Sequence, residues 1–224
     1  MIDTVIISGG NIQNGFALDF LKKRIKEGGR ESLALVAADS GMEWFMRNRE
    51  FIPDLAVGDF DSLSEEGKKY MESLNGLKII RLKPEKDDSD TQSAMNYAIQ
   101  NGAKRITILG ATGNRVDHLM ANFGLLVLAK NQGVEVILAD QYNYMKLVSD
   151  GEIIKKSEQF GKYISFFPLG GDVTGLTLEG FKYSLDHYRL TTADSGLTVS
   201  NEIVSEKAKV TYQSGTLLMI MSRD

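Results

Sequence analysis

The feature that most constrains the fold is a change in the pattern of apolar and polar residues near residue 140. Before it, short apolar runs alternate with amphipathic segments, a pattern typical of βαβ units. Helical stripes or caps predict intervening helices around 16–25, 43–48, 89–100 and 116–130, and a further helix that starts at Ser64. The apolar runs predict strands at Thr4–Ser8, Leu33–Ala37, Leu55–Val57, Lys78–Leu82, Arg105–Leu109 and Val134–Ala139. Residues 1–140 therefore predict an α/β domain with a Rossmann-like, open and mostly parallel sheet.

After Asp140 the helical stripes stop and short β-rich runs take over. Gly- and Asp-containing turns separate them at intervals of about 8–12 residues, which favours an all-β sandwich. The expected strands are Tyr144–Val148, Glu152–Lys155, Tyr163–Pro168, Val173–Leu178, Gly196–Val199, Lys207–Gln213 and Thr216–Met221. We therefore expect two domains, 1–140 and 141–224.

Composition narrows the function classes. The formal charge of the 224 residues is −4, which argues against a nucleic-acid binder. There is no cysteine and there are only two histidines, so a thiolate or His-rich metal site is excluded. No apolar run approaches the roughly 20 residues of a membrane span, and no signal peptide is visible at the N-terminus. We expect a soluble, cytoplasmic protein.

The segment Gly58–Ser62 is the strongest chemical signal. Asp59 and Asp61 follow the apolar run Leu55–Val57, and residues i and i+2 of an extended chain point to the same side. Converging carboxylates repel each other unless a cation lies between them, and Mg²⁺ is the natural guest. The alternative is a turn that caps the next helix, although Ser62 or Ser64 would cap better.

Other acidic residues share this placement. Asp39 follows a predicted strand, and Asp87, Asp88 and Asp90 lie between a strand and a helix. Ligands of open α/β sheets bind at the carboxyl ends of the strands, which would bring these groups to one edge. The cluster around Asp88 could instead be a capped helix start, and the adjacent Lys86 an ordinary solvated side chain.

Two Gly-containing turns predict phosphate binding. Gly110–His118 links a strand to a helix, where free backbone N–H groups suit phosphate, and Arg115 adds a forked donor. Asp117 and His118 could orient Arg115 or each other, or merely cap the helix. Gly9-Gly10 ends the first strand, but the pair is not a dinucleotide fingerprint. A Walker A pattern is absent from the sequence, so a standard P-loop enzyme is excluded.

The β-rich half offers fewer polar candidates. Tyr183, within the run Gly175–Leu185, could provide a stacking surface for a heteroaromatic ligand or belong to the core. Ser200-Asn201 could provide small polar contacts or form only a turn.

Together these segments resemble the thiamine pyrophosphokinase (thiamine diphosphokinase) family. The resemblance rests on Asp39-Ser40-Gly41, Gly58–Ser62, Lys86–Thr91 and Gly110–His118, and extends more weakly to Gly175–Leu185 and Ser200-Asn201. It implies a homodimer that transfers pyrophosphate from ATP to thiamine and releases AMP. Tyr183 departs from the pattern, because animal members carry Trp there.

The resemblance also suggests residue roles. The expected metal ligands for Mg²⁺ are Asp39, Asp59, Asp61 and Asp90. The expected catalytic residues are Asp59, Asp61, Asp87, Asp90 and Arg115. The expected ATP-binding residues are Gly9, Gly10, Lys86, Thr112, Arg115, Asp117 and His118. The expected thiamine-binding residues are Tyr183, Ser200 and Asn201. Which carboxylate of the Asp87–Asp90 cluster accepts the hydroxyl proton stays open.

Three rival functions come from other classes. A nucleotide-sugar glycosyltransferase also uses two Asp spaced by one residue, and a phosphatase can use an Asp nucleophile at a strand end. A nucleotide sensor would bind without turnover. Neither rival enzyme explains the Gly110–His118 loop or the β-rich half, and product identification separates all of them.

Overall fold

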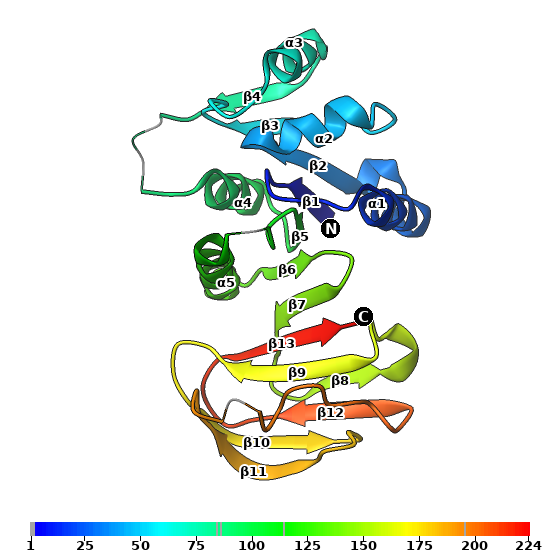
Figure 1. Cartoon of the computed structure of the whole chain (residues 1–224), viewed down its shortest axis with the longest axis vertical. Coiled ribbons are helices and arrows are strands. Elements are labelled where there is room, and N and C mark those ends of the chain that lie inside the picture. The colour runs from blue at the N-terminus through cyan, green and yellow to red at the C-terminus, as the bar shows by residue number, and fades with distance from the viewer. Residues whose placement is uncertain (1–2, 84, 86, 114, 195) are drawn as a thin grey trace. The chain divides into compact units, whose positions relative to one another are not determined.

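The computed structural model describes residues 3–83, 85, 87–113, 115–194 and 196–224. It separates into two compact units, residues 1–141 and 142–224. Figure 1 shows an α/β unit 1 and a unit 2 built from strands. Each unit has buried hydrophobic side chains of its own.

Unit 1 contains a parallel sheet in the order β4-β3-β2-β1-β5-β6, and each pair of neighbours runs parallel. Its strands are β1 (Asp3–Ile7), β2 (Leu33–Ala38), β3 (Leu55–Gly58), β4 (Lys78–Arg81), β5 (Arg105–Leu109) and β6 (Glu135–Ala139). Its helices are α1 (Asn14–Gly28), α2 (Met42–Arg47), α3 (Glu65–Ser73), α4 (Asp90–Gln100) and α5 (Val116–Lys130), with 3₁₀ turns η1 (Arg30–Ser32) and η2 (Asp39–Gly41).

The central strands read as continuous apolar runs because a parallel sheet is covered on both faces. Ile6, Ile7 and Leu35 are fully buried. The helix starts follow from capping: Ser64 Oγ accepts a hydrogen bond from Gly67 N at α3, and Ser89 Oγ accepts one from Gln92 N at α4.

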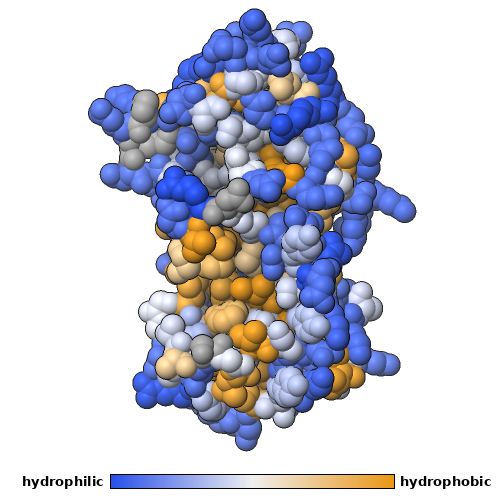
Figure 2. All heavy atoms as spheres, viewed as in Figure 1, coloured by the Kyte–Doolittle hydropathy of each residue, from blue (hydrophilic) through white to orange (hydrophobic). Residues whose placement is uncertain are grey.

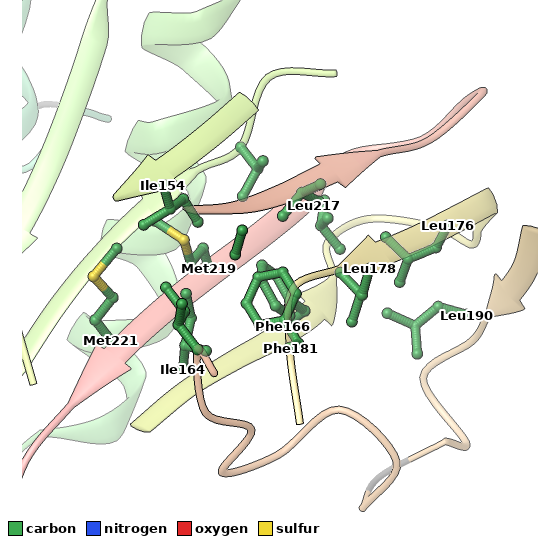
Figure 3. Close-up of a cluster of buried hydrophobic side chains, with 14 of the residues drawn as sticks. Ile154, Ile164, Phe166, Leu176, Leu178, Phe181, Leu190, Leu217, Met219 and Met221 are labelled. Carbon is green, nitrogen blue, oxygen red and sulfur yellow. The ribbon is translucent and has the colours of Figure 1, made fainter. Parts of the chain in front are cut away.

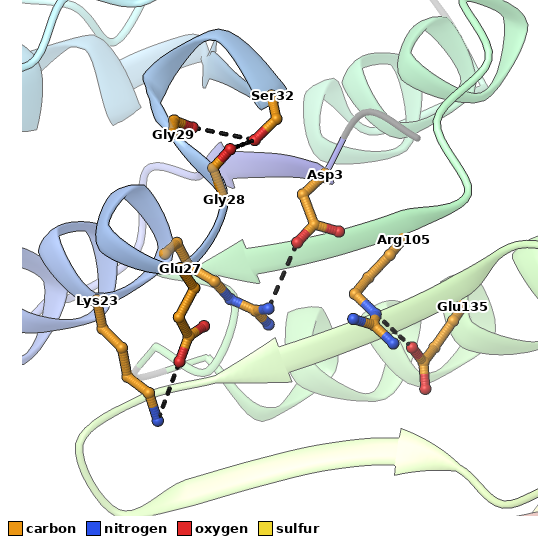
Figure 4. Close-up of polar contacts among 9 residues, drawn as sticks. Asp3, Lys23, Glu27, Gly28, Gly29, Ser32, Arg105 and Glu135 are labelled. Carbon is orange, nitrogen blue, oxygen red and sulfur yellow. Dashed lines mark hydrogen bonds and ion pairs between the residues drawn. The ribbon is translucent and has the colours of Figure 1, made fainter.

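Ion pairs join elements at the amino ends of the central strands (Figure 4). Arg105 of β5 donates to Glu135 of β6 at 2.8 Å, between residues that are register partners. Arg24 of α1 lies 3.4 Å from Asp3 of β1. The Arg105–Glu135 pair is the more exposed of the two, and exposed ion pairs contribute about 0–1 kcal/mol each.

Unit 2 consists of two antiparallel layers, as expected for a sandwich. One has the order β7-β13-β9 and the other β11-β10-β12-β8. The strands are β7 (Asn143–Leu147), β8 (Glu152–Lys155), β9 (Tyr163–Pro168), β10 (Val173–Glu179), β11 (Leu185–Leu190), β12 (Lys207–Thr211) and β13 (Leu217–Ser222), with the 3₁₀ turn η3 (Lys156–Glu158). Both layers contribute to one core, in which Phe166 and Phe181 pack edge to face at 5.5 Å (Figure 3).

Two strand predictions need correction. The expected strand Gly196–Val199 is a turn, in which Thr198 is anchored to Phe166 through its side chain and backbone. The strand β11 (Leu185–Leu190) was not expected, because its residues are largely polar and exposed. It nevertheless pairs with β10, which shows that tertiary pairing outweighs local pattern here.

Candidate functional site

The strand order reverses at β1, which has β2 on one side and β5 on the other. Ligands of open α/β sheets bind at the carboxyl ends of the strands at such a switch point. Two loops meet there, because Gly10 N donates to Gly110 O at 3.0 Å. A Cβ at Gly10 would lie 2.2 Å from that oxygen, and Gly110 has φ +76°. Glycine is therefore required on both sides of this contact.

A cavity of about 610 Å³ opens at this point. The β1, β2, β3 and β5 loops and the starts of α4 and α5 contribute to its wall. Its lining residues are Ser8, Gly9, Gly10, Asn11, Ala38, Asp39, Ser40, Asp59, Asp88, Ser89, Asp90, Thr91, Gly110, Ala111, Gly113, Arg115, His118, Ala121 and Asn122. The carboxyl-end segments expected from the sequence therefore lie around one space.

Three carboxylates converge beside this space. Ligand oxygens of Asp39, Asp59 and Asp61 all lie within 4.8 Å of one another. The expected reason was wrong for Asp59 and Asp61, because the chain between them is not extended. Phe60 has φ +60° and its ring is buried, so a tight turn anchored by that ring brings the carboxylates together.

The hydrogen bonding of Asp39 indicates whether this cluster suits a cation. Its Oδ2 accepts a hydrogen bond from Ser62 Oγ. Its Oδ1 is buried and, among the residues that the structure describes, has no hydrogen-bond partner. A buried carboxylate oxygen without a donor is costly unless a cation meets it. The three-carboxylate set is therefore a good fit for a hard dication such as Mg²⁺.

The members of the second acidic cluster, at the start of α4, differ in whether they line the cavity. Asp88 and Asp90 line the cavity, whereas Asp87 is exposed and lies outside the described lining. Asp88 accepts hydrogen bonds from Gln92 Nε2 at 2.6 Å and from Asn96 Nδ2 at 3.4 Å. Asp90 is not part of the 4.8 Å carboxylate group found among the described residues. Lys86 lies outside the described residues.

Arg115 and His118 line the cavity at the start of α5. Arg115 binds the Asp117 carboxylate through Nε at 3.2 Å and through Nη2. This hydrogen bonding raises the pKa of Arg115 and holds the pKa of Asp117 below its usual value. Asp117 is exposed, Thr112 is half-buried, and neither is among the described lining residues. Asp117 therefore binds Arg115, which is one of the three arrangements that the sequence left open.

Sequence reasoning missed a hydroxyl pair and an amide in the cavity wall. Ser8 Oγ and Thr91 Oγ1 lie 2.6 Å apart and join the end of β1 to the start of α4. Asn122 Nδ2 donates to Ala111 O at 2.8 Å and ties α5 to the Gly110 loop. The sequence clue that could have identified this pair is the position of its members, since Ser8 ends a predicted strand and Thr91 follows a helix cap.

In unit 2 the three expected ligand-binding residues form one group. Tyr183 is 54% exposed, whereas Asn201 is only 1% exposed. The Asn201 amide accepts from Tyr183 N at 3.0 Å and from Glu202 N at 2.9 Å, and donates to Tyr183 O at 2.7 Å. Ser200 is exposed with φ +55°, and its N–H donates to Ser165 Oγ. Tyr183 is thus not a core residue, and Asn201 holds its backbone.

Hydrophobic residues also reach the surface of unit 2 (Figure 2). Leu197, Val199 and Val204, which flank Ser200-Asn201 in the sequence, are 44%, 40% and 57% exposed. Across the part of the chain that the structure describes, no helix combines the length and apolar character needed to cross a membrane.

Comparisons with known proteins all indicate the same family. Residues 29–138 match the family model described as the thiamin pyrophosphokinase catalytic domain, and residues 151–217 match the thiamin pyrophosphokinase vitamin B1 binding domain. The thiamine pyrophosphokinase of Bacillus subtilis is 34% identical over 174 residues, covering 77% of this chain and 80% of the relative.

Solved structures of the same family are also similar to this chain. A crystal structure of thiamine pyrophosphokinase from Bacillus subtilis superposes with a TM-score of 0.83 at 29% identity and covers 99% of both chains. One from Geobacillus thermodenitrificans gives a TM-score of 0.81 at 27% identity, over 100% of this chain and 98% of the other.

Proposed function

Because this chain belongs to the thiamine pyrophosphokinase family and has that enzyme activity, we propose that the unit 1 cavity is where it binds ATP and Mg²⁺. The observation that carries the proposal is a single space lined by Asp39 and Asp59 of the three-carboxylate group, by two glycine loops and by two helix starts. A nucleoside triphosphate with its metal has the matching chemistry, because it brings negative phosphates and a hard dication.

Asp39, Asp59 and Asp61 are the proposed metal ligands, and Asp90 lies in the same cavity wall. A bound Mg²⁺ would neutralise negative charge on phosphate oxygens. The protein's own contribution is to hold three carboxylates in a fixed group despite their mutual repulsion. The buried Phe60 ring and the Ser62 hydrogen bond to Asp39 support that arrangement.

The phosphates are the proposed ligands of the glycine loops and helix starts. The starts of α4 and α5 present backbone N–H groups and the positive ends of their helix dipoles. Arg115 adds a forked cation, and its bond to Asp117 orients it in the absence of substrate. Gly9 and Gly10 let a ligand approach the backbone closely. Thr112 and Lys86 keep the ATP roles expected from the resemblance, as proposals.

In the proposed reaction the thiamine hydroxyl oxygen attacks the β-phosphorus of ATP. A new oxygen–β-phosphorus bond forms, the bond from the β-phosphorus to the α,β-bridging oxygen breaks, and AMP leaves. The hydroxyl proton passes to a carboxylate, for which Asp90 and Asp88 of the cavity wall are the proposed acceptors. Most of the catalysis is positioning and charge stabilisation, as in other phosphoryl transfers. Asp87 remains a proposed contributor from the same segment.

Unit 2 is the proposed thiamine-binding and dimerisation domain. Thiamine is a flat cation, and the exposed Tyr183 ring offers it an aromatic face. Ser200 is the proposed polar contact, and Asn201 acts by fixing the Tyr183 backbone. Leu197, Val199 and Val204 are exposed apolar side chains that a second copy would cover, as the proposed dimer requires. We propose cytoplasmic action, where ATP is supplied.

The test is product identification. The protein is incubated with ATP, MgCl₂ and thiamine, and the phosphorus NMR spectrum is followed over time. We expect AMP and thiamine diphosphate in equal amounts, with neither formed when thiamine is omitted. ADP with thiamine monophosphate, free phosphate, or sugar transfer from an added nucleotide sugar would each contradict the proposal. Addition of EDTA in excess over Mg²⁺ should stop the reaction.

A further inference from the structure

Ser62 has been described so far only as a hydrogen-bond donor to Asp39. The sequence suggested Ser62 or Ser64 as the cap of the following helix. The structure assigns the cap to Ser64, whose Oγ accepts from Gly67 N at 3.0 Å. Ser62 Oγ instead donates to Asp39 Oδ2, across 23 residues of sequence. This contact joins two loops at a proposed metal ligand, and it therefore calls for a functional explanation.

The loop holds the Ser62 hydroxyl in a fixed place. Two residues before it Phe60 is 1% exposed, and directly after it Leu63 is 3% exposed, so the chain is anchored in the core on either side of Ser62. Directly beyond them, Ser64 N donates to Glu43 Oε1 of α2 at 2.9 Å. Ser62 therefore lies on a short arc that is fixed at both ends, although its own side chain is exposed.

The Asp39 backbone is fixed as well. Asp39 has φ +47°, a left-handed conformation that non-glycine residues adopt only when their surroundings hold them. Gly58 packs directly against it, since a Cβ at Gly58 would lie 3.0 Å from Asp39 Cα. With the backbone held, the remaining freedom of Asp39 is rotation of its carboxylate. The Ser62 hydrogen bond removes that rotation.

The two oxygens of Asp39 thereby have separate tasks. Oδ2 is taken by Ser62, and Oδ1 is buried and has no hydrogen-bond partner among the described residues. Among the described residues Oδ1 is thus left without a donor, and a monodentate metal ligand requires one such oxygen. Hydrogen-bond partners of metal ligands orient those ligands and tune them.

We propose that Ser62 is a positioning residue that fixes the Asp39 carboxylate for one-oxygen coordination of the divalent cation, a role that rests on the proposed metal site. Removing such a partner typically weakens metal binding about 10–100-fold. Ser62→Ala should therefore weaken cation binding by roughly 10-fold or more. Ser62→Thr keeps the hydroxyl on an exposed side chain and should restore binding to within about 3-fold of wild type.

The test measures metal binding directly, without turnover. Mn²⁺ is titrated into wild type, Ser62→Ala, Ser62→Thr, Ser64→Ala and Asp39→Asn, and free Mn²⁺ is followed by electron paramagnetic resonance. Ser64→Ala is the matched control: it removes a hydroxyl two residues away and a helix cap, so it should lower the Tm by roughly 2–4 °C and leave Mn²⁺ affinity within about 2-fold. Asp39→Asn should abolish tight binding.

The outcomes separate the two levels of the proposal. Weaker binding by Ser62→Ala alone, with rescue by Ser62→Thr, supports the positioning role. Unchanged affinity in Ser62→Ala, or an equal loss in Ser64→Ala, overturns that role and leaves the metal site intact. Failure of wild type to bind Mn²⁺ more tightly than Asp39→Asn overturns the metal site itself, and the role of Ser62 with it.

Discussion

Asn201→Ala should act mainly by destabilising unit 2, and not by removing a contact to the substrate. The side chain makes hydrogen bonds to Tyr183 N, Tyr183 O and Glu202 N from a position that is 1% exposed. A hydrogen bond contributes about 1 kcal/mol net, so the loss of these bonds should cost about 3 kcal/mol of unfolding free energy. For a chain of this size that corresponds to a fall in Tm of roughly 6–12 °C.

Tyr183→Ala is the matched comparison. The ring is 54% exposed, so its removal should change the Tm by no more than about 2 °C. If the ring stacks on thiamine, the thiamine KM should rise about 10-fold while the ATP KM stays within about 2-fold. The pair therefore separates a residue that holds the backbone from a residue that contacts the substrate.

Thermal unfolding can be followed for each unit. Trp44, the one tryptophan of the sequence, lies in unit 1, so its fluorescence reports that unit. Far-UV circular dichroism also includes the strands of unit 2. In Asn201→Ala the dichroism transition should move to lower temperature by more than the fluorescence transition. A Tm of Asn201→Ala within 2 °C of wild type, or equal destabilisation by Tyr183→Ala, would refute the reasoning.

Two further predictions concern charge. Asp59→Asn and Asp61→Asn should each lower kcat at least about 100-fold without lowering the Tm, because each removes one of the repelling carboxylates; near wild-type activity at limiting Mg²⁺ would count against the metal role. Hydrogen bonds from the Thr191 backbone and hydroxyl and from the Tyr188 hydroxyl hold the pKa of Asp194 below its usual value. That stabilisation is present above the ordinary pKa and lost as pH falls through the folded one, so the Tm advantage over Asp194→Asn should shrink below about pH 4.

Much of unit 1 could be predicted because its signals are local. Buried parallel strands read as continuous apolar runs, and Ser64 and Ser89 mark helix starts that the structure confirms. The convergence of Asp59 with Asp61 was also predicted, but not the turn at Phe60 that produces it. Sequence spacing cannot distinguish an extended dipeptide from a left-handed residue, because the difference depends on where the Phe60 ring is buried.

The contacts that could not be predicted are those between distant segments. Ser8 meets Thr91 across 83 residues, and Ser62 meets Asp39 across 23. A serine or threonine in isolation is compatible with any surface loop, so no local pattern marks such pairs. In unit 2, β11 is too polar to be recognised as a strand and exists through its pairing with β10.

The strand order of unit 1 also has a consequence for folding. The central strand β1, residues 3–7, pairs on one side with β5, residues 105–109, about a hundred residues later. At a synthesis rate of roughly 5–20 residues per second, β1 waits about 5–20 s on the ribosome for that partner. During this interval a hydrophobic strand edge is open, and closing so long a loop is slow. The strand order around the proposed nucleotide site therefore leaves one edge of β1 dependent on late residues, although its other edge can pair with β2 much earlier. We expect this open edge to make the nascent chain prone to aggregation.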